Sequence, residues 1–389
     1  MTTSEQITPP SPASNPNFAL GVPSPNQIEV SLFGPGYGES IVFHLPGGYW
    51  VVVDSCVRPN SKRSAPLEYL ELLGVDMATR VALIVASHWH DDHVRGLAEL
   101  VSQCRSASFA CANALCQNEF LTLVARHQQQ RTIEMGSGVS EMAATFDMLR
   151  GRQPMFVGPD RMILNVDGSS IAPNLRSTVT TLSPSDKQFQ IFISEIASLI
   201  PATRATKYRA VALRPNHVAM ALWVNVGEDC SILLGSDLED VGTDVNLGWN
   251  AILRSTTRPQ GRASVFKVAH HGSRTGHNDS VWSSMLQGNP ISILTPFVRG
   301  RVALPTPGDA TRIMNFSSHA HSTARVRQPA GRQRSHDVEK TIREAVGRSL
   351  RPIEQRFGHI RLRKVVGEGN DWTHEYGGDA RPLSTVHHF

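Results

Sequence analysis

The stretch that decides the fold is VALIVASHWHDDH, residues Val81–His93. Its first six residues form an apolar run with the length of a buried strand. Three histidines and a carboxylate follow within six residues, as His88, His90, Asp92 and His93. Side chains two residues apart point to different faces of a helix, so we expect a loop that turns these groups toward one point. Imidazole nitrogens and carboxylate oxygens are typical ligands of zinc and similar divalent cations, so the pattern favours a metal site over an accidental polar cluster.

Segments with the patterns of β-strands lie on both sides of this motif. Each is an apolar run or an alternation of apolar and polar residues, bounded by glycine or turn residues. The predicted strands span residues 28–33, 41–45, 51–56, 81–86, 218–226, 230–237, 264–269, 291–297, 359–366 and 371–378, and residues 178–185 read as a strand that enters a turn. Helical patterns lie between them, at 66–73, 111–130, 140–151 and 189–200. Strands that arrive in two batches, each mixed with helices, predict an α/β protein with two sheets sandwiched between helices.

Composition narrows the class of protein. Of the 389 residues, 40% are hydrophobic, which excludes a wholly disordered chain. No apolar run approaches the roughly 18 residues of a membrane-spanning helix, and residues 1–12 lack the basic start and apolar core of a secretory signal. The five cysteines form no CxxC pair, so we expect buried thiols in a reducing compartment. These features together predict a cytoplasmic protein without membrane contact.

The chain divides by composition into three parts. Residues 1–25 repeat proline, serine and asparagine and are expected to form a flexible tail. Residues 26–325 are expected to form one domain, in which residues 94–216 are a long helical insert or connector. Residues 326–389 form a basic extension that ends in a predicted strand pair. The range Arg325–Lys364 holds twelve basic and four acidic residues, which could track a phosphate backbone or form a solvated face.

The motif HxHxDH after a buried strand resembles the signature of the metallo-β-lactamase superfamily. The resemblance runs from about residue 28 to about residue 325. It implies an αββα four-layer sandwich, in which two mixed β-sheets are flanked by helices. It also implies that residues 26–325 form a metal-dependent hydrolase domain.

The other positions at which the superfamily carries metal-site residues follow in order. Asp54 ends an early strand, where the family places a residue that supports the motif histidines. His217 precedes a strand, Asp237 ends one, and His270 and His271 follow another. The resemblance implies two zinc ions, with manganese as the alternative, bridged by Asp237. The implied ligands are His88, His90 and His217 for one ion and Asp92, His93 and His271 for the other.

Within the superfamily, the segments NHVAMALWV, LLGSDLE and KVAHHGS look most like the nuclease-like domain of the competence DNA-uptake channel protein. They also look like the bacterial surface phosphorylcholine esterases. These likenesses imply a phosphodiesterase or nuclease that uses a metal-bridging hydroxide, with Asp92 and His270 in the catalytic set. They place His271 on the metal and His270 beside the substrate, and the reverse assignment stays open.

The chain departs from the competence-type pattern twice. It has His217 where that pattern has a serine, which adds a ligand and favours a complete two-metal site. It also inserts Ser236 between Gly235 and Asp237, where the pattern reads GD, and this insertion could shift the loop.

Three polar residues near the motif region are candidates for holding a substrate phosphate. They are Ser273 and Arg274 in GSRTG, and Arg299 in PFVRGR. Nucleic acid is the expected substrate, and a net charge of +4 tolerates such an anionic partner without requiring it.

Two alternative functions stay open. The first is hydrolysis of a small ester, lactone or phosphorylcholine-type substrate, because one fold supports many reactions. The second is an effector module gated by a partner protein, for which the 123 residues between His93 and His217 could form a lid or docking surface. No feature of the sequence sets the oligomeric state.

Overall fold

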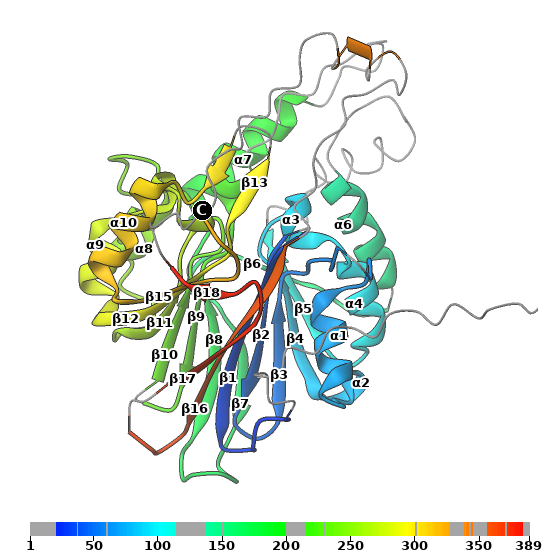
Figure 1. The fold of residues 1–389 in the computed structure, drawn as a ribbon, viewed down its shortest axis with the longest axis vertical. Helices are drawn as coiled ribbons and strands as arrows, with labels where there is room; N and C mark the ends of the chain where they lie inside the picture. The colour runs from blue at the N-terminus through cyan, green and yellow to red at the C-terminus, as the bar shows by residue number, and fades with distance from the viewer. Residues whose placement is uncertain are drawn as a thin grey trace, which may run out of the picture.

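Two eight-stranded mixed β-sheets lie face to face, with helices on their outer faces (Figure 1). This arrangement is the αββα four-layer sandwich expected from the sequence. The computed structural model describes residues 21–36, 38–59, 61–113, 137–149, 151–199, 215–228, 230–299, 302–326, 338, 340–341, 344, 356–369 and 372–383.

The first sheet has the strand order β17-β16-β1-β2-β3-β4-β5-β6. Its β1–β3 part is an antiparallel meander, whereas β3 to β6 run parallel. Near-continuous apolar runs such as Tyr49–Val53 and Val81–Ala86 are typical of strands buried on both faces. The strands are β1 Gln27–Pro35, β2 Ser40–Leu45, β3 Tyr49–Val53, β4 Val81–Ala86, β5 Ser108–Ala112, β6 Met155–Val157, β16 Phe357–Val365 and β17 Thr373–Gly378.

The second sheet has the strand order β18-β15-β12-β11-β10-β9-β8-β7. Its β10, β11, β12 and β15 run parallel, and the strands β7 to β10 are antiparallel. The strands are β7 Met162–Asp167, β8 Arg176–Thr181, β9 Leu222–Val226, β10 Cys230–Leu234, β11 Ala263–Lys267, β12 Leu286–Leu294, β15 His319–Ser322 and β18 Arg381–Pro382. A separate hairpin consists of β13 Phe297–Arg299 and β14 Val302–Leu304.

Helices cover the outer face of each sheet and give the molecule three apolar cores. In Figure 1, α1 Ala65–Leu72, α2 Met77–Arg80, α4 Leu97–Gln103 and α6 Ser137–Met148 lie beside the first sheet. On the other side, α8 Gly248–Arg254, α9 Asp279–Ser284 and α10 Pro307–Phe316 lie against the second sheet. One core lies under each helical layer, and the third, with Val30, Leu222 and Ile232, fills the space between the sheets. The remaining helices are α3 Asp91–Val94, α7 Asp186–Leu199, and the 3₁₀ turns η2 Pro215–Val218, η3 His270–Gly272 and η4 Arg274–Gly276.

Residues 94–216, expected as a helical insert, also carry strands of both sheets. β5 and β6 complete one edge of the first sheet, and β7 and β8 complete one edge of the second. Of the predicted helix at 111–130, residues 114–130 lie outside the described residues, as do residues 1–20 of the predicted tail.

The C-terminal strand pair expected in 326–389 is built into the first sheet. β16 pairs with β1 along its whole length, from Gln27↔Val365 to Pro35↔Phe357. Arg363 on β16 forms an ion pair with the buried carboxylate of Glu29 on β1, at 2.7 Å. Most of the basic range, including Arg327, Arg332, Arg334, Arg343 and Arg348, lies outside the described residues.

Two expectations from composition can be compared with the fold. Among the residues that the structure describes, no helix is long and apolar enough to cross a membrane. Cys56, Cys104, Cys111 and Cys230 are buried, and Cys116 lies outside the described residues.

Candidate metal centre

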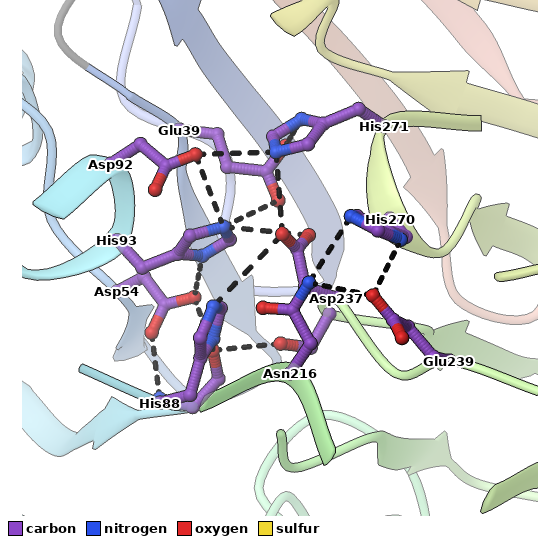
Figure 2. Close-up of polar contacts among 12 residues, drawn as sticks. Glu39, Asp54, His88, Asp92, His93, Asn216, Asp237, Glu239, His270 and His271 are labelled. Atoms are coloured by element: carbon purple, nitrogen blue, oxygen red, sulfur yellow. Dashed lines mark hydrogen bonds and ion pairs between the residues drawn. The ribbon is translucent and has the colours of Figure 1, made fainter. Parts of the chain in front are cut away.

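The histidines and aspartates of the motif gather where parallel strands of both sheets end (Figure 2). The motif loop, His88–His93, follows β4, and its Asp92 and His93 lie in the single helical turn α3, where the sequence predicted a loop throughout. Asp54 follows the neighbouring β3. Asp237 follows β10, and His271 follows the neighbouring β11. Side chains beyond the carboxyl ends of adjacent parallel strands meet at one edge of a sheet, which is where ligand sites of open α/β sheets form. Because both sheets present this edge at the same place, four loops converge.

Two groups of side chains could each hold a metal ion, and they share one carboxylate. Within each group the candidate ligand atoms all lie within 4.8 Å of one another. The structure therefore brings together six of the seven ligands expected from the sequence, and His217 is the exception. The groups are Asp92, His93, Asp237 and His271, and His88, His90 and Asp237.

Asp237 lies between the histidines of the two groups. Its Oδ1 is 3.4 Å from His93 Nε2, and its Oδ2 is 3.3 Å from His271 Nε2. The same Oδ2 is 4.0 Å from His88 Nε2 in the other group. In the group that contains Asp92, the Oδ2 atom of Asp92 lies 3.3 Å from His271 Nε2. A carboxylate within reach of both groups can bridge two cations.

The buried polar atoms of the centre fit a divalent cation. His88 Nε2, His93 Nε2, His271 Nε2 and Asp237 Oδ1 are fully buried and have no hydrogen-bond partner. The other ring nitrogen of each histidine is engaged: His88 Nδ1 lies 3.0 Å from Ser87 Oγ, and His271 Nδ1 lies 3.0 Å from the Thr295 carbonyl oxygen. A histidine whose outer nitrogen is held in this way presents its inner nitrogen as a metal ligand. Unpartnered buried polar atoms are costly, and cations at this position would satisfy all four.

Asp54 supports the motif loop from behind. Its Oδ2 accepts from His93 Nδ1 at 2.8 Å and from Ser87 Oγ at 2.7 Å, and its Oδ1 accepts from Ser87 N at 2.7 Å. These contacts fix the orientation of the His93 ring and the start of the loop. The carboxylate therefore occupies the supporting position that the resemblance implied.

Burial and neighbouring carboxylates shift the pKa values of the histidines in different directions. Burial lowers the pKa of His88 well below its ordinary value, so this ring is neutral, as a ligand must be. Burial acts in the same direction on His271, but the carboxylates of Asp237 and Asp92 outweigh it and raise its pKa to about 10. Asp237 and Asp54 likewise raise the pKa of His93 well above its ordinary value, against the effect of burial. A bound cation would replace these protons.

Several turns that aim the ligands have left-handed backbone conformations. The φ angles are 61° at Asp54, 46° at Ser236, 48° at His270 and 52° at His271. Residues other than glycine rarely adopt such angles, and they concentrate at functional sites where the surrounding structure holds them. Ser236 immediately precedes Asp237, and Asp237 after this left-handed turn faces the histidines.

Neighbouring segments hold these loops in place. Gly38 brings the β1–β2 loop against the motif loop, because a Cβ there would lie only 2.0 Å from the Asp92 carbonyl oxygen. Glu39 N then donates to that same oxygen at 2.8 Å. On the other side, Arg312 of α10 donates to the carbonyl oxygen of Gly272 at 2.8 Å and so fixes the turn that carries His271.

His217 lies in a different cluster, which is centred on Glu239. Its Nε2 is 3.6 Å from Glu239 Oε2. Asn216 Nδ2 donates to Glu239 Oε1 and to His270 Nε2, at 3.1 Å in each case. His270 Nδ1 lies 2.7 Å from Thr275 Oγ1. His217 thus belongs to this partly exposed cluster. Figure 2 shows His270 beside Glu239 and Asn216, whereas His271 faces the carboxylates of the metal centre.

The three candidates for phosphate binding have different surroundings. Ser273 is buried, and its Oγ accepts from Thr275 N at the start of η4. Arg274 is exposed on η4. Arg299 lies on β13, and its side chain is outside the part of the chain that the structure describes.

Four residues of the site region were not singled out from the sequence: Glu39, Lys267, Asn216 and Glu239. Glu39 and Lys267 form a buried ion pair behind the metal centre. Glu39 stands in a glycine-rich turn, which offered no signal of its own. Lys267 lies inside the predicted strand SVFKVA, and a lysine is rarely buried unless it is paired. That charge within an apolar run was a signal that could have found the pair.

Comparisons with known proteins show a likeness in fold. No family model matches the chain, and no curated protein matches it. Solved structures that match include a metallo-β-lactamase from Cronobacter sakazakii with a HARLDQ motif, at 17% identity, 62% of this chain, 75% of that chain and a TM-score of 0.34. They also include the Rm3 metallo-β-lactamase, at 15% identity, 66% of this chain, 80% of that chain and a TM-score of 0.32. The structural neighbours of this chain are thus metallo-β-lactamase fold proteins, and the likeness concerns the fold alone.

Proposed function

We propose that the protein is a metal-dependent hydrolase that cleaves phosphodiesters, with nucleic acid as its substrate. The observation that carries this proposal is the pair of ligand groups that share Asp237 and point unpartnered nitrogens at one another. His88, His90 and Asp237 would hold one divalent cation, and Asp92, His93, His271 and Asp237 the other. Zinc fits this mixture of imidazole and carboxylate ligands, and manganese is the alternative. Such ions would supply an activated water and neutralise charge on a phosphate.

The Glu239 cluster places His270 beside this centre. Asn216 Nδ2 also donates to a carboxylate, so it is a donor, and His270 Nε2 is therefore the acceptor in their contact. The ring proton then sits on Nδ1, which faces Thr275 Oγ1. These two partners hold the His270 ring in one tautomer and one orientation. We propose that it binds the substrate phosphate or its leaving group, with Ser273, Arg274 and Arg299 as further candidates.

The likeness of KVAHHGS and LLGSDLE to competence-type nuclease domains favours a phosphodiester over other esters. The mildly basic net charge of +4 is compatible with a nucleic acid partner.

The proposal is tested with the purified full-length protein and Zn²⁺ or Mn²⁺. Single- and double-stranded DNA, RNA, a generic aryl phosphodiester and a carboxylic ester are offered in parallel. We expect cleavage of the phosphodiesters and loss of cleavage in the variant His90→Ala with Asp92→Ala.

A matched control is His319→Ala, which removes an exposed histidine on β15. It should keep wild-type activity. Cleavage by the double variant at the wild-type rate, or hydrolysis of the carboxylic ester alone, would contradict the proposal.

A further inference from the structure

A buried ion pair lies directly behind the metal centre. Lys267 is 1% exposed and Glu39 is 3% exposed, and Lys267 Nζ contacts Glu39 Oε1. The cavity beside them has a volume of only about 10 Å³. Glu39 Oε2 has no hydrogen-bond partner and lies 3.7 Å from His271 Nδ1. The pair is therefore enclosed and faces the ligand histidines.

Lys267 holds the turn that aims the shared carboxylate. Its Nζ donates to the carbonyl oxygen of Ser236 at 3.0 Å and lies 3.9 Å from Asp237 Oδ1. The same carbonyl oxygen accepts from His270 N at 2.9 Å. Ser236 has the left-handed φ of 46°, a conformation that persists only when neighbours hold it. The ammonium group is one of those neighbours.

The ion pair also joins the two sheets that supply the ligands. Glu39 immediately precedes β2 of the first sheet, and Lys267 is the last residue of β11 in the second. The backbone N–H of Glu39 donates to the carbonyl oxygen of Asp92 at 2.8 Å. A connection thus runs from the Asp92 loop through Glu39 and Lys267 to the turn that carries Asp237.

We propose that Lys267, through its ion pair with Glu39, is a positioning residue that holds Asp92 and Asp237 at the spacing that binds metal. The inference rests on the proposed metal centre and extends it, because neither member of the pair is one of the expected ligands. The proposal and simple electrostatics predict opposite changes in metal affinity when Lys267 is lost. A nearby ammonium group repels a cation, so charge alone predicts that loss of Lys267 tightens metal binding, whereas positioning predicts that it weakens binding.

The first test is Zn²⁺ binding by the full-length variant Lys267→Met, measured by calorimetric titration. We expect affinity at least about tenfold weaker than wild type, the low end of what supporting residues behind a metal site contribute. Affinity equal to or tighter than that of wild type would overturn the proposal.

The second test is the double variant Glu39→Gln with Lys267→Met. It removes both charges together, so it leaves the net charge unchanged and no buried charge unpaired, and it should fold. If Lys267 acts by positioning, the Zn²⁺ affinity of this double variant is also at least about tenfold weaker than that of the wild type. Recovery of wild-type affinity would mean that only charge balance matters, and would overturn the proposal.

The matched control is another ion pair between strands, formed by the buried Glu29 and the partly buried Arg363, which joins β1 and β16. The variant Glu29→Gln with Arg363→Met removes a comparable pair that does not contact the expected ligands, so it should bind Zn²⁺ as wild type does. Equal weakening there would assign the effect to general stability and overturn the proposal. Wild-type protein that binds no Zn²⁺ would overturn the metal centre itself, whereas Zn²⁺ binding without cleavage would contradict only the proposed activity.

Discussion

The two halves of the metal centre are built in different ways. The first sheet supplies the motif loop, His88–His93, in which the ligands are nearly consecutive and follow one strand. The second sheet supplies Asp237 and His271 from two separate loops, each with a left-handed residue at or next to the ligand. The contiguous half depends on local chain geometry, which a short motif encodes. The dispersed half depends on contacts such as those of Lys267 and Arg312, which only the folded chain brings together.

The largest effect is expected from the loss of Asp237, the one candidate ligand that both groups share. Asp237→Ala takes a carboxylate from both groups, so we expect Zn²⁺ affinity to fall by more than the roughly 100-fold upper range for supporting residues. Hydrolysis should be lost with it. Calorimetric titration and metal analysis of the purified variant measure the effect.

His90→Ala is the control within the contiguous half. It leaves the group of Asp92, His93, Asp237 and His271 intact, so one tight Zn²⁺ should remain. Two tightly bound ions in Asp237→Ala would show that this carboxylate bridges nothing.

A change of pH tests the half that carries His271, because the carboxylates of Asp237 and Asp92 raise the pKa of this ring. The pKa of His271 is raised to about 10, above its unfolded value of roughly 6.5. This group therefore stabilises the metal-free fold fully below about pH 6.5, and the contribution is lost as the pH rises through 10. Thermal unfolding of the metal-free protein should show a melting temperature that declines across this window.

Zn²⁺ affinity should move in the opposite direction across the same window. The cation displaces the protons, so affinity should rise by up to roughly tenfold per pH unit for each proton released. Affinity that is flat between pH 6.5 and 9 would contradict the proton balance described for His271 and His93.

The smallest effect on Zn²⁺ affinity is expected for His217, which the resemblance implied as a ligand but which lies outside both ligand groups. Its Nε2 faces Glu239 at 3.6 Å, outside both ligand groups. We therefore expect His217→Ala to change Zn²⁺ affinity much less than His90→Ala does, in the same titration. Equal losses in the two variants would place His217 on the metal when the ion is bound.

Much of the fold could be predicted because its signals are local. Val81–Ala86 is an apolar run of strand length, and the alternation in Ile41–Leu45 and the runs near Val51 mark neighbouring strands. Within residues 94–216 the sequence indicated a strand near β8 but not β5, β6 and β7, because β5 and β6 are short and β7 is an edge strand with a weak pattern. Nor did it show that β16 pairs with β1, since this pairing joins the two ends of the chain.

The sequence by itself determined the class of the protein and the chemistry of its strongest motif. Spacing within six residues is enough to place the four motif ligands directly after one buried strand, although not to show that Asp92 and His93 lie in the helical turn α3. Only the tertiary structure decided that His271 faces the carboxylates while His270 and His217 face Glu239, and that Lys267 pairs with Glu39 behind Asp237. The physical reason is that these choices depend on left-handed turns and on burial between two sheets, and both are properties of the packed chain.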